Sequence, residues 1–171
     1  FSCISCVAGT YSLSGAEACS KCSPGKYTSS SGASYCPECV AGKYTGLTAA
    51  TACTACAPGK TAADKGQAAC EVCPEGSTTA GVNGQSTTVC TKCAAGKFKS
   101  YGGTGSCSSC SHGTYSLAGA TGCTACNPGY YANVYGMSAC LQCTTGTIAS
   151  AYAKSVCTSC VAGKYQSNAG Q

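Results

Sequence analysis

The chain has 171 residues, of which 20 are cysteine, while charged residues make up only 9% and leave a formal net charge of +5. Its hydrophobic residues are mostly alanine, cysteine and tyrosine, so the large aliphatic side chains are too few for a conventional core. This composition excludes an ordinary globular enzyme as the favoured interpretation, and the absence of arginine argues against nucleic-acid binding. No apolar run approaches the roughly 20 residues of a membrane span, so we expect this segment to be soluble.

Every cysteine belongs to a CxxC pair, and the pairs recur every 16 to 20 residues along the chain. Self-similarity at a fixed period is typical of an array in which each unit packs on its neighbours. The pairs are Cys3 and Cys6, Cys19 and Cys22, Cys36 and Cys39, Cys53 and Cys56, Cys70 and Cys73, Cys90 and Cys93, Cys107 and Cys110, Cys123 and Cys126, Cys140 and Cys143, and Cys157 and Cys160.

A glycine follows every pair at the third position, and in Pro24-Gly25, Pro58-Gly59 and Pro128-Gly129 a proline precedes it. Proline presets the first central residue of a type II turn and glycine accepts the positive φ of the second, so we expect one such turn in every unit. Most units then carry an aromatic residue, expected to cover a disulfide, and a second glycine before the next pair. The fold predicted is small disulfide-rich β: a linear array of ten CxxC hairpin units forming an extended rod, with little or no helix.

A weaker two-unit rhythm in the gap lengths favours a module of two CxxC units. The predicted modules are 1–35, 36–69, 70–106 with a longer loop at 74–89, 107–139 and 140–171. Within that loop, residues 81–84 are expected to protrude, because lengthening a surface loop costs little free energy. Because the pattern runs to both ends, we also expect the chain to be a segment of a longer array.

Three chemistries compete for the CxxC pairs. A thioredoxin-like redox motif needs one activated pair in a βαβ context, which this chain does not offer. Successive pairs could form Cys₄ zinc sites, but ten equivalent pairs in a Gly/Ser/Thr/Tyr-rich chain with a single histidine favour disulfides. We therefore expect all twenty cysteines to be oxidised, with no bound metal, no cofactor and no catalytic residue.

Units such as CSKCSPGKYTSSSGASYC, CTACNPGYYANVYGMSAC and CTSCVAGKYQSNAG resemble the ephrin-receptor-like cysteine-rich repeat, a module abundant in surface proteins of protists and algae. The resemblance covers the whole chain, and more distantly the units are similar to the tumour-necrosis-factor-receptor module. That second resemblance implies bonding of first to third and second to fourth cysteines, such as Cys3 with Cys19 and Cys6 with Cys22. A ladder that joins Cys6 with Cys19 is the alternative, and it would leave Cys3 and Cys160 without partners.

Few side chains other than cysteine are candidate contact residues. His112, the only imidazole, is interpreted as a turn residue because it stands where other units carry Pro, Ala or Thr. Five lysines that directly follow the repeated glycine form a candidate cationic contact stripe, namely Lys26, Lys43, Lys60, Lys97 and Lys164. A spaced row of cations suits an anionic polysaccharide or another protomer, although a solvated face is the simpler interpretation. Every asparagine lacks the N-x-Ser/Thr acceptor, so any glycan would be O-linked.

The functional hypothesis is an extracellular structural protein, a disulfide-stapled rod that forms part of a filament, cell-surface hair or coat. Its expected partners are copies of itself, with polysaccharide as a second candidate. The alternative is the ligand-binding stalk of a receptor or surface antigen, and an enzyme is not expected.

Overall fold

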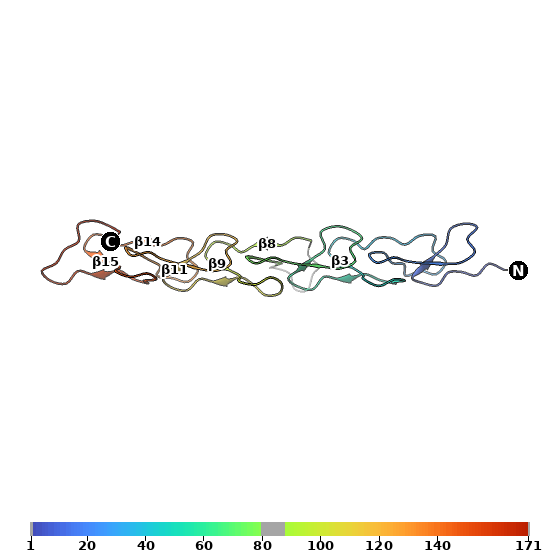
Figure 1. The fold of residues 1–171 in the computed structure, drawn as a ribbon, viewed down its shortest axis with the longest axis horizontal. Coiled ribbons are helices and arrows are strands. Elements are labelled where there is room, and N and C mark those ends of the chain that lie inside the picture. The colour runs from blue at the N-terminus through green and yellow to red at the C-terminus, as the bar shows by residue number, and fades with distance from the viewer. Residues whose placement is uncertain (1, 80–87, 171) are drawn as a thin grey trace. The chain divides into compact units, whose positions relative to one another are not determined.

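The structure is a computed structural model that describes residues 2–79 and 88–170. The described chain contains no helix: Figure 1 shows short strands joined by long loops. The expected small disulfide-rich β fold is thus confirmed. The segment 81–84, expected to protrude, lies outside the described residues.

Each hairpin pairs two residues that follow a repeated glycine with the two residues inside the next CxxC pair. Threonine and tyrosine, which favour extended backbone, dominate the first strands. The antiparallel pairs are β1 (Thr10–Tyr11) with β2 (Ser20–Lys21), β3 (Lys43–Tyr44) with β4 (Thr54–Ala55), β5 (Lys60–Thr61) with β6 (Glu71–Val72), β7 (Ser77–Thr78) with β8 (Thr91–Lys92), β9 (Lys97–Phe98) with β10 (Ser108–Ser109), β11 (Thr114–Tyr115) with β12 (Thr124–Ala125), β13 (Tyr130–Tyr131) with β14 (Leu141–Gln142) and β15 (Thr147–Ile148) with β16 (Thr158–Ser159). A single bridge, Lys26 with Glu38, closes the remaining hairpin.

The expected type II turn occurs after all ten CxxC pairs. In the first, the Thr10 amide donates to the Val7 carbonyl over 3.0 Å, and Gly9 between them has a φ of 84°. The other nine repeat this bond at 3.0 to 3.2 Å, each with its glycine at positive φ. A side chain other than glycine is strained at that backbone conformation, which explains why the glycine recurs without exception.

A second left-handed residue precedes most cysteine pairs by four positions. Glycine occupies it in several hairpins, as in Gly119 and Gly136, whereas Ala49 and Ala153 take the same conformation with φ of 56° and 60°. The second turn expected from the glycine pattern is confirmed, and it extends to two alanines that the pattern could not reveal. Two hairpins therefore hold an L-residue where the backbone favours glycine.

Most successive hairpins are joined by recurring backbone hydrogen bonds, with an exception at Gly59, whose amide donates to the Thr79 hydroxyl. The turn glycine of one hairpin donates to a carbonyl three residues beyond the turn glycine of the next, as Gly113 does to Ala132 over 2.8 Å. In return, the left-handed residue of that next hairpin donates to a cysteine carbonyl, as Gly136 does to Cys110 over 2.8 Å. The hairpins therefore follow one another as repeats, and within each stretch of the described chain where these bonds recur they connect a hairpin to its successor.

Contacts divide the array into two compact units. The first comprises Phe1–Cys73 with Thr79–Cys90, and the second comprises Pro74–Thr78 with Thr91–Gln171. The proposed division into five modules stays a prediction.

The core of each unit consists of sulfur and small side chains. The second cysteine of most pairs is fully buried, including Cys22, Cys39, Cys110 and Cys143 at 0% exposure. The position three residues after the turn glycine is also buried, and it usually holds Thr, Ser or Ala. Val, Leu and Ile side chains lie largely on the surface, so aliphatic burial contributes little and the disulfides take its place.

Several turn glycines lie against the backbone of the hairpin two steps further along the chain. A Cβ added at Gly113 would overlap the carbonyl oxygen of Ala153, whereas a Cβ at Gly146 would meet nothing within 4 Å. Their φ angles, 76° and 78°, are nearly the same, so the two glycines differ in the space around them and not in conformation.

This difference predicts unequal effects of Gly113→Ala and Gly146→Ala. Both substitutions incur about 1 kcal/mol of left-handed strain, but Gly113→Ala must also displace the Ala153 backbone, which adds about 1 to 3 kcal/mol. Hydrogen exchange of the Ala153 amide should show a large loss of protection in Gly113→Ala. Equal losses in both variants would contradict the close approach.

Candidate functional site

Nine disulfides connect the second cysteine of each pair to the first cysteine of the next. They are Cys6–Cys19, Cys22–Cys36, Cys39–Cys53, Cys56–Cys70, Cys73–Cys90, Cys93–Cys107, Cys110–Cys123, Cys126–Cys140 and Cys143–Cys157. Each closes a sequence separation of 13 to 17 residues with Cα atoms 5.6 to 5.8 Å apart. The chain-entropy model assigns about 3 kcal/mol to a crosslink of this loop length.

The pairing of first with third and second with fourth cysteines is wrong. Cys19 bonds to Cys6 and not to Cys3, and Cys22 bonds to Cys36 and not to Cys6. The physical reason is the short strand β2 inside the pair: Cys19 and Cys22 flank it three positions apart, so their side chains point to opposite faces. Cys19 bonds back to Cys6, and Cys22 bonds forward to Cys36. Cys3 and Cys160 consequently have no disulfide partner within the described chain.

The two pairing schemes predict different products when the hairpin loops are cut without reduction. Cleavage after tyrosine, which occurs inside no CxxC pair, cuts loops such as those of the Cys110–Cys123 and Cys126–Cys140 hairpins and leaves one CxxC pair per fragment there. With the disulfides of the structure, each fragment is bonded to the fragments on both sides, so the digest should stay one covalent chain until reduction. Mass spectrometry that finds isolated two-fragment products, each with two disulfides, would contradict it.

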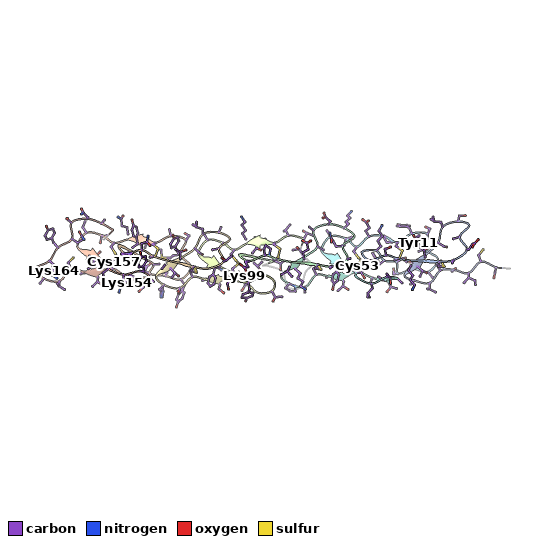
Figure 2. The ribbon with its side chains drawn as sticks, in the orientation of Figure 1. Tyr11, Cys53, Lys99, Lys154, Cys157 and Lys164 are labelled. Atoms are coloured by element: carbon purple, nitrogen blue, oxygen red, sulfur yellow. A yellow bond between two sulfur atoms is a disulfide. The ribbon has the colours of Figure 1, made fainter. Side chains whose placement is uncertain are left out.

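The aromatic position two residues after the turn glycine is half-buried in most hairpins, as for Tyr11 (labelled in Figure 2) and for Tyr27, and it is exposed at Tyr165. Tyr27 and Cys53 line one hollow, and Tyr131 lines another with Cys157. In both cases the cysteine belongs to the hairpin that follows the tyrosine. Each ring therefore flanks the disulfide of the next hairpin, which is one hairpin further along the chain than the disulfide nearest to it in the sequence.

The five candidate stripe lysines are exposed, but they are only part of a wider pattern. The register pairs the residue after the turn glycine with the residue before the second cysteine of the next pair. One member of this cross-strand pair is lysine in each of the first six hairpins: Lys21 opposite Thr10, Lys26 opposite Glu38, Lys43 opposite Ala55, Lys60 opposite Val72, Lys92 opposite Ser77, and Lys97 opposite Ser109. We call these six lysines the cation ladder.

Sequence reasoning missed Lys21 and Lys92 because it followed a single position of the repeat. The signal that would have found them is a lysine directly before the second cysteine, in Cys19-Ser20-Lys21-Cys22 and in the equivalent segment at 90–93. Once the strands pair, this residue faces the position that follows the turn glycine. Within the cation ladder, the Lys26 ammonium lies 3.5 Å from a carboxylate oxygen of Glu38. Lys164, which belongs to the stripe expected from the sequence, is not part of the cation ladder.

Lys99 is a second residue that the sequence did not single out. It occupies the buried position three residues after the turn glycine, which holds small side chains elsewhere, and it is 3% exposed. Its ammonium donates to the carbonyls of Ser77, over 3.2 Å, and Gly103, and lies 5.9 Å from the centre of the Tyr101 ring. These carbonyl acceptors satisfy the ammonium after it leaves water, so the side chain joins the β7–β8 hairpin to the loop that follows β9.

Replacing this lysine predicts a local loss of stability. Lys99→Met keeps the length of the side chain but leaves two buried carbonyls without their donor, at a cost of about 1 to 3 kcal/mol. The control, Lys97→Met on the exposed face of β9, should change stability by less than about 0.5 kcal/mol. Hydrogen exchange of the Lys99 and Gly76 amides measures the difference, and equal exchange in both variants would refute the proposed tie.

His112 lies in a turn, as expected, and its ring packs on the ring of Tyr135 with centroids 4.3 Å apart. Within residues 2–79 and 88–170, no three His, Cys, Asp or Glu side chains are grouped so as to hold a metal ion. Nor does any helix of those residues have the length and apolar character to cross a membrane.

The fold and its disulfides define the class: a repeat of small β-hairpins, each closed by a disulfide. The family model for the tyrosine-protein kinase ephrin type A/B receptor-like domain matches residues 9–56 and 113–156, which together are more than half of the chain. The chain therefore belongs to the ephrin type A/B receptor-like family, as its motifs indicated. No curated protein matches the chain. Membership suggests an extracellular disulfide-rich module of a type that is typically non-enzymatic.

Proposed function

We propose that the chain is a non-catalytic structural array that forms part of an extracellular filament, cell-surface hair or coat. The observation that carries this proposal is the recurrence of the same hydrogen bonds between successive hairpins, together with a core made of disulfides. An arrangement of this kind extends by repetition without a closed hydrophobic core. Its covalent ladder also resists local unfolding, because every crosslink restricts the unfolded chain.

Copies of the chain are the proposed partners. Each sheet has only two strands, and although the first strand of several hairpins is bridged to the next hairpin, as Tyr115 is to Met137, the second strand has an outer edge whose backbone groups can pair with another molecule. A heterologous contact between identical arrays propagates and does not close. The cation ladder keeps the arrays soluble and offers a second contact surface, for an anionic polysaccharide, at Lys43 and at Lys97, which stand opposite Ala55 and Ser109.

The proposal predicts concentration-dependent assembly of the oxidised chain. Sedimentation velocity over a range of concentrations should show growing species, and electron microscopy of the same samples should show fibres or sheets. A receptor stalk would instead stay a monodisperse monomer at every concentration, and that result would contradict the structural proposal. A chain carrying Lys43→Glu and Lys97→Glu tests whether the cation ladder takes part in the assembly.

A further inference from the structure

Two neighbouring tyrosines of β13, Tyr130 and Tyr131, line separate hollows in the second compact unit. Adjacent residues of a strand point to opposite faces, so one strand supplies an aromatic ring to each hollow. The first hollow, of about 330 Å³, is lined by Tyr115, Tyr130 and Asn127, with Cys140 of the next disulfide. The second, of about 270 Å³, is lined by Tyr131, Asn133, Gln142 and Thr144, with Cys157.

The polar groups in these hollows have unused hydrogen-bonding capacity. The side-chain amides of Asn127, Asn133 and Gln142 make no hydrogen bond to another residue of the described chain. Each amide offers two donors and one acceptor oxygen. No charged side chain of the described residues lines either hollow, so both hollows combine aromatic faces with neutral donors and acceptors.

We propose that the first hollow, which holds two tyrosine rings and the Asn127 amide, binds a sugar unit of a neutral polysaccharide. A sugar ring presents an apolar face of C–H groups, which packs on tyrosine, and a rim of hydroxyls, which pair with amides. A ligand with carboxylate or sulfate groups would have no cation to pair with here, and burying an unpaired charge is costly. Such binding would let the array adhere to a cell-wall or extracellular glycan, so it extends the proposed structural function and rests on it only for the extracellular setting.

The repeat contains a natural comparison in the first compact unit. The equivalent hollow beside the Cys39–Cys53 disulfide holds about 210 Å³ and is lined by Tyr27, Val40, Lys43 and Ala52. Val40 stands where the first hollow has Asn127, and Lys43 stands where it has Tyr130. The repeat therefore supplies the hollow, whereas the second ring and the amide are particular to the second unit.

The natural comparison also supplies the test variant. Asn127→Val with Tyr130→Lys copies two residues that the same positions already hold in a folded hairpin, so the backbone should be kept. The control is Tyr152→Ala, which removes an exposed tyrosine (65% exposed) that lines neither hollow. Expression without glycosylation ensures that a glycan on the chain's own serines and threonines does not fill the hollows.

The experiment is a titration of the oxidised full chain with neutral hexasaccharides (cellohexaose, laminarihexaose, mannohexaose and xylohexaose) and with hexagalacturonate, followed by calorimetry and NMR. We expect at least one neutral hexasaccharide to bind with an affinity insensitive to salt. The affinity should fall at least tenfold in the double variant and stay unchanged in Tyr152→Ala. Binding of no neutral hexasaccharide, equal binding by the double variant, or preferential salt-sensitive binding of the uronate would each overturn the proposal.

Electron microscopy of the double variant separates this proposal from the structural one. The variant should assemble like the original chain, because its changes lie in the hollows and not in the hydrogen bonds between hairpins. Loss of saccharide binding with intact assembly supports both proposals. Intact saccharide binding by a chain that never assembles would support the saccharide site alone.

Discussion

The structure depends on the disulfide that joins the second cysteine of one pair to the first cysteine of the next. Ordering a residue costs about 1 to 2 kcal/mol of backbone entropy, and strands of two residues with little aliphatic burial cannot offset that cost across a whole hairpin. A crosslink over 13 to 17 residues restricts the unfolded chain, while its buried sulfurs fill the space that leucine or valine would occupy in a larger core. The CxxC spacing then connects each stapled hairpin to the next without an intervening linker.

The local features of the fold could be predicted because single residues determine them. A glycine at a fixed distance after each pair implied the turn, and the structure has it in every unit. The disulfide pairing could not be obtained this way, because both schemes satisfy the same spacing. The three-dimensional path of the chain decides between them: Cys19 and Cys22 flank β2 and point to opposite faces, so Cys19 bonds back to Cys6 while Cys22 bonds forward to Cys36.

The candidate contact residues were predicted only in part, for a related reason. The lysines after the turn glycine share one position of the repeat and were therefore visible, whereas Lys21 and Lys92 join the cation ladder only when the strands pair. Lys99 could not be recognised, because the burial of its position arises from packing between hairpins. The structure thus adds residues whose role depends on a neighbouring hairpin, which a reading of one repeat at a time does not include.

A repeat of this kind separates the residues that maintain the fold from those that distinguish one hairpin from another. Cysteines and turn glycines are fixed by covalent geometry and by the close approach of the backbone, as at Gly113 against Ala153. The residue after the turn glycine is not fixed: it is Lys43 in one hairpin, Tyr130 in another and Thr147 in a third, all in the same cross-strand register. Because substitution there leaves the hydrogen bonds between hairpins unchanged, the surface can change from cationic to neutral and aromatic along one chain. Different binding properties can therefore accumulate on this scaffold without loss of its stability.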